Sequence, residues 1–97
     1  MAQERSIPQT LEQAFSALDE LLTPTGRNAF MRKPERKAVI EAHMTLGLHI
    51  RNAWFRSART ALNGYLREKG ARSLDDASSL LLTAYWRHLN GVPADLD

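Results

Sequence analysis

The spacing of apolar residues along this chain predicts amphipathic helices over most of its length. The clearest pattern lies in residues 38–54, where apolar side chains recur every three or four positions and polar ones take the opposite side. A face this wide has to be covered by other elements, so we predict a central helix over residues 34–54. Its apolar face comprises Ile40, His43, Met44, Gly47 and Trp54, widened by Val39, Leu46, Ile50 and Ala53.

Thr10 and Gln13 mark the start of an earlier helix. A threonine followed three residues later by glutamine has the form of a capping box, in which each side chain satisfies the other's free backbone N–H. Apolar residues follow at helical spacing as far as Leu22, and Pro24 disfavours helical geometry in the residue before it. We predict a helix over residues 10–22, then a turn, then a short helical piece that Thr23 caps.

Two later stretches carry similar signals. Ser73 precedes two acids in a predicted first turn, and Gly91 stops the helix after Asn90, so residues 74–90 form the last predicted helix. Thr60 can cap a shorter helix that Gly70 closes with a left-handed residue. No segment alternates apolar and polar residues for long enough to predict a strand.

Together these elements predict an all-α fold, a compact bundle of four to five helices around the long central helix. The first and last predicted helices pack on that central helix. A chain of 97 residues makes a single domain. We expect residues 1–7 to be a frayed terminus and residues 92–97 a short tail.

Composition narrows the class of protein. Cysteine is absent, which excludes disulfide bridges, thiolate zinc sites and cysteine nucleophiles. The longest apolar cluster, residues 80–82, is far too short to cross a membrane, and the first residues lack the apolar run of a secretory signal. We therefore expect a cytoplasmic protein that has no membrane partner.

Charge is unevenly distributed along the chain. The net charge is +2, but residues 27–37 hold five bases and one acid, and residues 51–72 hold six bases and one acid. The remainder of the chain holds two bases and nine acids. Two interpretations follow: the basic stretches are solvated helix faces, or they meet an anionic partner, either nucleic acid or an acidic protein surface.

No arrangement of residues indicates catalysis or a cofactor. His43 and His49 are six residues apart, about 120° around a helix, so they cannot easily share a metal ion. Asp75 and Asp76 are adjacent and point about 100° apart on a helix, which suits capping better than a catalytic pair. We predict a buried contact or a hydrogen bond for each of His43 and His88, and we expect no enzyme, no cofactor and no metal site.

A partner-binding site is the remaining candidate. Arg51 and Trp54 are of residue types enriched at the energetic centres of interfaces. Arg51 has a structural alternative, an ion pair with Asp75 or Asp76. Trp86 is either covered by the N-terminal segment or exposed as an aromatic anchor. The predicted partner-binding residues are Arg51, Asn52, Trp54, Arg56, Arg59, Trp86 and Arg87.

The chain also contains three short motifs, IRN-x-W in residues 50–54, DD-x-S in residues 75–78 and YWR-x-LNG in residues 85–91. In combination they resemble the pattern of a family of small bacterial domains of unknown function, over nearly the whole chain. The chain departs from that pattern in residues 55–60, which stand in place of a glycine-rich loop, and at Leu74, where a proline is usual. The resemblance supports the fold and implies no known reaction, cofactor or catalytic residue.

The function that these features favour is a non-catalytic protein-binding module. We expect a small cytoplasmic inhibitor or adaptor, of the kind that bacteria use as immunity proteins and phages use against host defence, as anti-CRISPR proteins do. The alternative is an accessory protein that binds nucleic acid through residues 51–72 and 27–37. The alternative is weakened by the acidic ends and by the absence of a known recognition motif.

Overall fold

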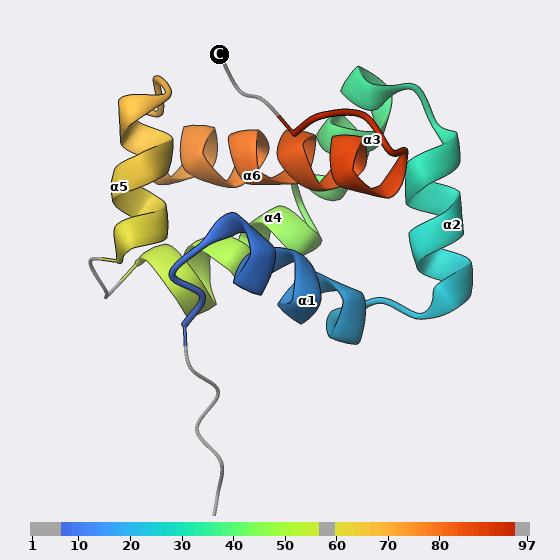
Figure 1. Cartoon of the computed structure of the whole chain (residues 1–97), viewed down its shortest axis with the longest axis horizontal. Helices are drawn as coiled ribbons and strands as arrows, with labels where there is room; N and C mark the ends of the chain where they lie inside the picture. Colours follow the sequence, from blue (N-terminus) through green and yellow to red (C-terminus); the bar gives the residue numbers. More distant parts are fainter. Residues whose placement is uncertain (1–6, 57–59, 95–97) are drawn as a thin grey trace, which may run out of the picture.

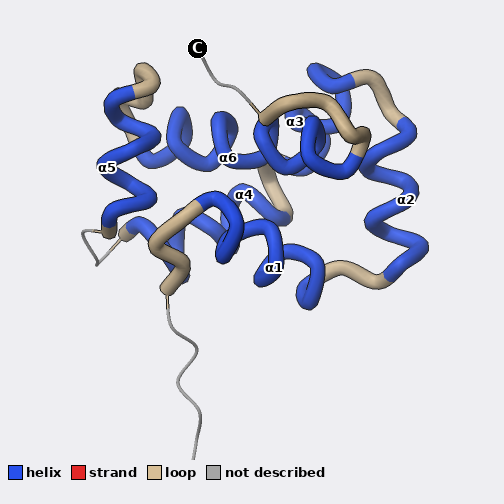
Figure 2. The backbone as a smooth tube through the Cα atoms, viewed as in Figure 1, coloured by secondary structure: helices blue, strands red, loops and turns tan. Residues whose placement is uncertain are grey.

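The computed structural model of the chain describes residues 7–56 and 60–94, and every regular element in them is helical (Figure 2). This confirms the predicted all-α fold. The elements in chain order are α1 (Leu11–Leu21), α2 (Pro24–Arg32), α3 (Glu35–Ala42), α4 (Leu46–Ile50), a π-helical turn η1 (Arg51–Phe55), α5 (Ala61–Glu68) and α6 (Leu74–Leu89).

Helix α6 is the element on which the others pack. It contacts α1, α2, α3, α4, η1 and α5. In Figure 1 it crosses the middle of the molecule, with α5 and α2 lying across its two ends. Six of its residues are buried, namely Ala77, Ser78, Leu81, Leu82, Ala84 and Tyr85. The prediction that residues 34–54 form the central helix is wrong, because α6 has that position.

Residues 34–54 form three short elements instead of one helix. The break falls at Thr45, whose φ of −113° and ψ of −84° are not helical. Its N–H and its hydroxyl both donate to the carbonyl of Ala42, at 3.1 and 3.3 Å, and so close the end of α3. The carbonyl of His43 accepts a bond of 3.4 Å from Arg51 Nη1. A side chain from later in the chain thus satisfies a backbone group at the break.

The break changes which residues of this segment enter the core. Ile40 and Met44, which we placed on the apolar face, are 61% and 69% exposed, so that prediction is wrong. The buried residues of α3 and α4 are Ala38, Val39, Ala42, Gly47 and Ile50. Val39, Gly47 and Ile50 of the predicted face are therefore buried, whereas Ile40 and Met44 are not. Gly47 lies close to α6, since a Cβ there would lie 3.6 Å from Ser78 Oγ.

All four predicted N-caps are confirmed. The side-chain oxygens of Thr10, Thr23, Thr60 and Ser73 each accept a bond of 3.0 to 3.1 Å from the backbone N–H three residues later. The reciprocal half of the capping box at Gln13 is displaced by one residue, because its Oε1 accepts from the N–H of Gln9 at 2.8 Å. Each cap contributes about 1 kcal/mol. These helix starts could be predicted from sequence because each cap bonds to a group only three residues away.

The ends of the described chain pack against the core. Ile7, which we expected in a frayed terminus, and Ala94, which we expected in the tail, are partly buried there. The other residues of the predicted terminus, 1–6, and residues 95–97 of the predicted tail lie outside the described residues. Gly70 and Gly91 have the positive φ angles, 115° and 71°, that the predicted helix ends require. Within residues 7–56 and 60–94, no helix is long and apolar enough to span a membrane.

Candidate functional site

Arg51 lies at the meeting point of three elements. Its Nε is 3.1 Å from Asp75 Oδ1, and its Nη1 donates to Ser78 Oγ at 3.1 Å as well as to the carbonyl of His43. Its side chain is only 11% exposed. Arg51 therefore makes the ion pair with Asp75 that was its structural alternative. Its contacts join the end of α3 and the start of η1 to the start of α6.

Trp86 and Arg87 hold the connection between α2 and α3. Trp86 Nε1 donates to the carbonyl of Lys33 at 2.9 Å, and the residue is partly buried against the core. Arg87 binds both carboxylate oxygens of Glu35, at 2.7 and 3.3 Å. Two of the predicted partner-binding residues thus have partners within the chain.

The other predicted residues lie around η1. Asn52 and Arg56 are exposed, and Arg56 Nη1 donates to Asn52 Oδ1 at 3.1 Å. Trp54 is 7% exposed and lies at the rim of a groove described below. Arg59 lies outside the described residues. The predicted residues therefore do not form one surface, because Arg51 lies between helices and Trp86 and Arg87 lie at the far end of α6.

The histidines lie apart from one another. His88 stacks its ring on Phe15, with centroids 4.5 Å apart, although the residue itself is exposed. His43 is partly buried, and His49 is exposed with its ring edge-on to Trp54 at 6.0 Å. In the part of the chain that the structure describes, no group of three or more His, Cys, Asp or Glu could hold a metal ion.

The two basic stretches lie at opposite ends of α6. Residues 27–37 belong to α2, to the start of α3 and to the connection between them. Of residues 51–72, 51–56 belong to η1 and the residue after it, 57–59 lie outside the described residues, and 60–72 belong to α5, its cap and the loop after it. Figure 1 shows α2 and α5 separated by the length of α6. Several of the bases are paired with acids, as in Arg27 with Asp19 at 3.7 Å. Lys33 is 2.6 Å from Glu41, and this hydrogen bond lowers the pKa of the Glu41 carboxyl. The bases therefore do not form one continuous strip.

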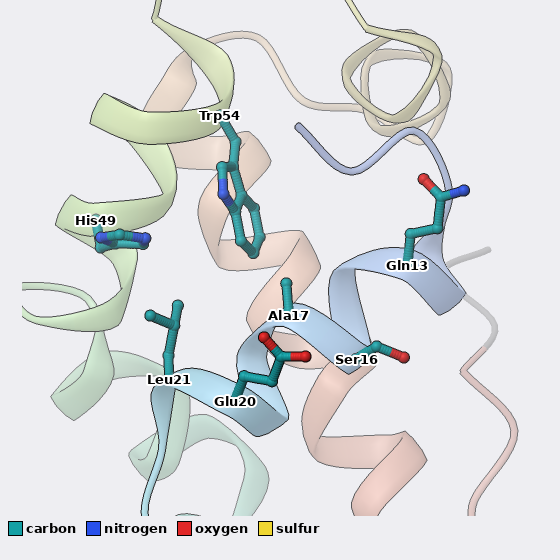
Figure 3. A pocket seen from close by; sticks show the side chains of 7 residues that line it. All are labelled: Gln13, Ser16, Ala17, Glu20, Leu21, His49 and Trp54. Atoms are coloured by element: carbon teal, nitrogen blue, oxygen red, sulfur yellow. The ribbon is translucent and has the colours of Figure 1, made fainter. Parts of the chain in front are cut away.

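A groove of about 580 Å³ runs between α1 and the α4–η1 segment (Figure 3). Its lining residues on α1 are three and four positions apart, which places them on one face of that helix. Small side chains, Ser16 and Ala17, occupy the middle of this face and make the surface concave. The complete lining is Gln13, Ser16, Ala17, Glu20, Leu21, His49 and Trp54.

The π-helical turn supplies the opposite wall of the groove. Its hydrogen bonds run over five residues, so the turn is wider than an α-helical one. Trp54 and Phe55, neighbours in sequence, are both buried as a result. The Trp54 ring points from η1 toward Ala17 of α1, while Leu21 extends toward His49 (Figure 3). One wall of the groove is thus aromatic, and the α1 wall facing it carries polar side chains as well as Ala17 and Leu21.

The sequence predicted Trp54 as a partner-binding residue, but it did not predict any site residue on α1. The outward face of α1 has mixed polarity, since Gln13, Ser16 and Glu20 alternate with Ala17 and Leu21. Such a face resembles any solvated side of an amphipathic helix. It becomes a groove only because η1 lies beside it, and no local signal in the sequence gave that placement.

A second hollow of about 540 Å³ lies between α1 and α5, around Phe15 and Tyr65. Its rim includes Ala94, the last residue that the structure describes. We take the first groove as the candidate site because it contains Trp54, which the sequence had already singled out.

A family described as a domain of unknown function, DUF6794, matches residues 7–89. The chain belongs to this family. Searches of curated proteins and of solved structures found no match. The matched region contains IRN-x-W and DD-x-S in full and ends inside the third motif. The structure shows that IRN-x-W and DD-x-S meet, because Arg51 contacts both Asp75 and Ser78. Residues of these two motifs thus hold the helices of this chain together.

Proposed function

We propose that this domain is a non-catalytic protein-binding module that receives its partner in the groove between α1 and α4–η1. The observation that carries the proposal is the shape and lining of the groove. It extends over residues 13–21 of α1, about 12 Å along the helix axis, and is open at the surface. A segment of another protein fits such a site better than a compact metabolite does.

The lining has the composition of a binding surface. Trp54 supplies an aromatic anchor, a residue type over-represented among the residues that dominate binding energy. Gln13, Ser16 and Glu20 surround it with groups that can donate or accept hydrogen bonds. Trp54 is held in place by burial against the core, so the site needs little ordering when a partner binds.

Within this proposal the protein is a small inhibitor or adaptor in the bacterial cytoplasm, an immunity protein or a phage counter-defence protein of the anti-CRISPR kind. Such proteins act by covering or joining surfaces, and a single preformed groove on a small domain is sufficient for that role. Nucleic-acid binding is less favoured, because the basic stretches lie at opposite ends of α6 and several bases are paired.

The test is a pulldown with matched arginine variants. Ser16→Arg fills the middle of the groove from an exposed position, and Asn28→Arg adds the same side chain to an exposed position on α2. Tagged wild type and both variants are incubated with nuclease-treated and with untreated lysate of the source organism, and bound proteins are quantified by mass spectrometry. We expect one stoichiometric protein that Asn28→Arg retains and Ser16→Arg loses at least tenfold.

Two results would contradict the proposal. If both variants recover the same amount of the bound protein, the partner does not bind in the groove. Loss of all bound protein on nuclease treatment, with binding that falls steeply as salt is raised, would favour the nucleic-acid alternative.

A further inference from the structure

We infer that the second hollow, the one between α1 and α5, binds a small organic amine with an apolar body. The hollow and the groove share no lining residue, so the inference does not depend on the proposed function. It rests on the size of the hollow, on its apolar interior and on the single charged side chain in its lining, Glu12.

The interior of the hollow is apolar and aromatic. Phe15 of α1 and Leu62 of α5 are its most buried lining residues, at 6% and 1% exposed, and Tyr65 beside them is partly buried. The volume of about 540 Å³ falls within the range usual for pockets that bind small organic molecules. The apolar and aromatic members of the lining are Leu11, Phe15, Ala61, Leu62, Tyr65 and Ala94.

The polar side chains of the lining leave one charge without a partner. Gln9 Oε1 accepts from the backbone N–H of Ala61 at 3.0 Å, and the Thr10 hydroxyl accepts from the N–H of Gln13 at 3.1 Å. Both side chains thus already make contacts within the chain. Glu12 is exposed, and within residues 7–56 and 60–94 its carboxylate makes no ion pair or hydrogen bond.

The charge of the lining selects the ligand. The lining contains no base, and Lys69, whose Nζ lies 5.7 Å from the centroid of the Tyr65 ring, lines a different hollow beside Asp76. A carboxylate ligand would meet the like charge of Glu12, whereas an ammonium group would donate hydrogen bonds to it. An ammonium group on an apolar body therefore matches both the charge and the interior of the hollow.

The experiment is a ligand titration followed through the backbone amide resonances of the protein. The probes are phenethylamine, phenethyl alcohol and phenylacetate, which share a phenyl ring on a two-carbon chain and differ in charge. Probes of this size bind weakly, so we expect saturation only at about 1–10 mM. The amides of Leu11, Leu62 and Tyr65 should shift, and phenethylamine should bind about fivefold more tightly than phenylacetate.

Three variants test where the amine binds. Glu12→Gln should reduce the affinity for phenethylamine to that for the alcohol. Glu20→Gln, a matched change at an exposed acid of α1 that lines the groove, should leave it unchanged. Ala61→Phe fills the hollow from an exposed position and should weaken binding of all three probes at least tenfold. Because Glu12 also lies in the first turn of α1, where an acid stabilises the helix, circular dichroism checks the fold of each variant.

Three outcomes would overturn the inference. If the amides of the lining do not shift at about 10 mM phenethylamine, the hollow does not bind such a ligand. If phenethylamine and phenylacetate bind equally to the wild type, or if Glu12→Gln keeps the preference, Glu12 does not select an amine. Ser16→Arg, which fills the groove, should bind phenethylamine as the wild type does, and a loss there would place the amine in the groove.

Discussion

Helix α6 and residues 34–54 carry similar amphipathic patterns, and only one of them folds as a continuous helix. Helix α6 contacts six other elements, and it runs unbroken from Leu74 to Leu89. In residues 34–54 the helix ends at Ala42 and restarts at Leu46. The difference shows that periodicity identifies apolar residues, while the contacts available in the fold decide which of them are buried.

The largest expected effect compares an apolar residue of each region. Leu81→Ala, at a residue that is 0% exposed, should lower the free energy of unfolding by about 2–5 kcal/mol, because it leaves a cavity beneath the helices that cover α6. Ile40→Ala, at a residue 61% exposed, should change it by less than about 0.5 kcal/mol. Urea unfolding followed by circular dichroism measures both. Similar losses for the two variants would mean that Ile40 is buried after all.

The next effect concerns the bonds that hold the broken segment to α6. Arg51→Met keeps much of the apolar stem but removes the contacts to Asp75, Ser78 and the His43 carbonyl, and should cost about 2–3 kcal/mol. Arg56→Met is the matched control, because Arg56 is exposed and bonds only to Asn52 in the described structure, and should cost less than about 0.5 kcal/mol. Chemical denaturation measures the free energy of unfolding of both variants. Equal values would show that the contacts of Arg51 do not stabilise the fold.

A smaller effect lies inside α6. The Tyr85 hydroxyl is buried and donates to Asp19 Oδ1 at 2.7 Å, and burial followed by this bond raises the pKa of Tyr85 well above its ordinary value of 10.0. Tyr85→Phe should cost about 1 kcal/mol at neutral pH through loss of the bond.

The same variant has a pH signature. The unfolded chain releases the Tyr85 proton near its ordinary pKa of 10.0, whereas the folded chain keeps it. The stability that the hydroxyl contributes is therefore complete below pH 10.0 and is lost as the pH rises above it. We expect the difference between wild type and Tyr85→Phe to shrink in denaturation curves above that pH. A constant difference would show that Tyr85 titrates alike in both states, and Tyr65→Phe is the control.

The smallest effect compares two helical glycines. A Cβ at Gly47 would lie 3.0 Å from Arg51 Nη1 and 3.5 Å from the Ala42 carbonyl oxygen, whereas a Cβ at Gly64 would meet nothing within 4 Å. Gly64→Ala should raise the free energy of unfolding by about 0.5–1 kcal/mol through helix propensity. Gly47→Ala should lower it by up to about 1 kcal/mol. Thermal unfolding gives the sign of each change, and a stabilising Gly47→Ala would contradict the close packing described for this position.

The sequence determined those parts of the fold that depend on neighbouring residues. Four helix starts were predicted because the cap side chain bonds to a backbone group three residues away, those at Thr10, Thr23, Thr60 and Ser73. The ion pair of Arg51 with the acids after Leu74 was one of two alternatives, since the sequence alone could not bring those residues together.

Tertiary structure decided where the chain breaks and what that break exposes. The break at Thr45 is accompanied by a bond from Arg51 to the His43 carbonyl, a contact between residues eight positions apart that no helical period predicts. The π-helical turn places Trp54 against α1, far from it in sequence, and so creates the groove. Local bonds specify helices, but a groove is a relation between two of them, and only packing against α6 fixes that relation.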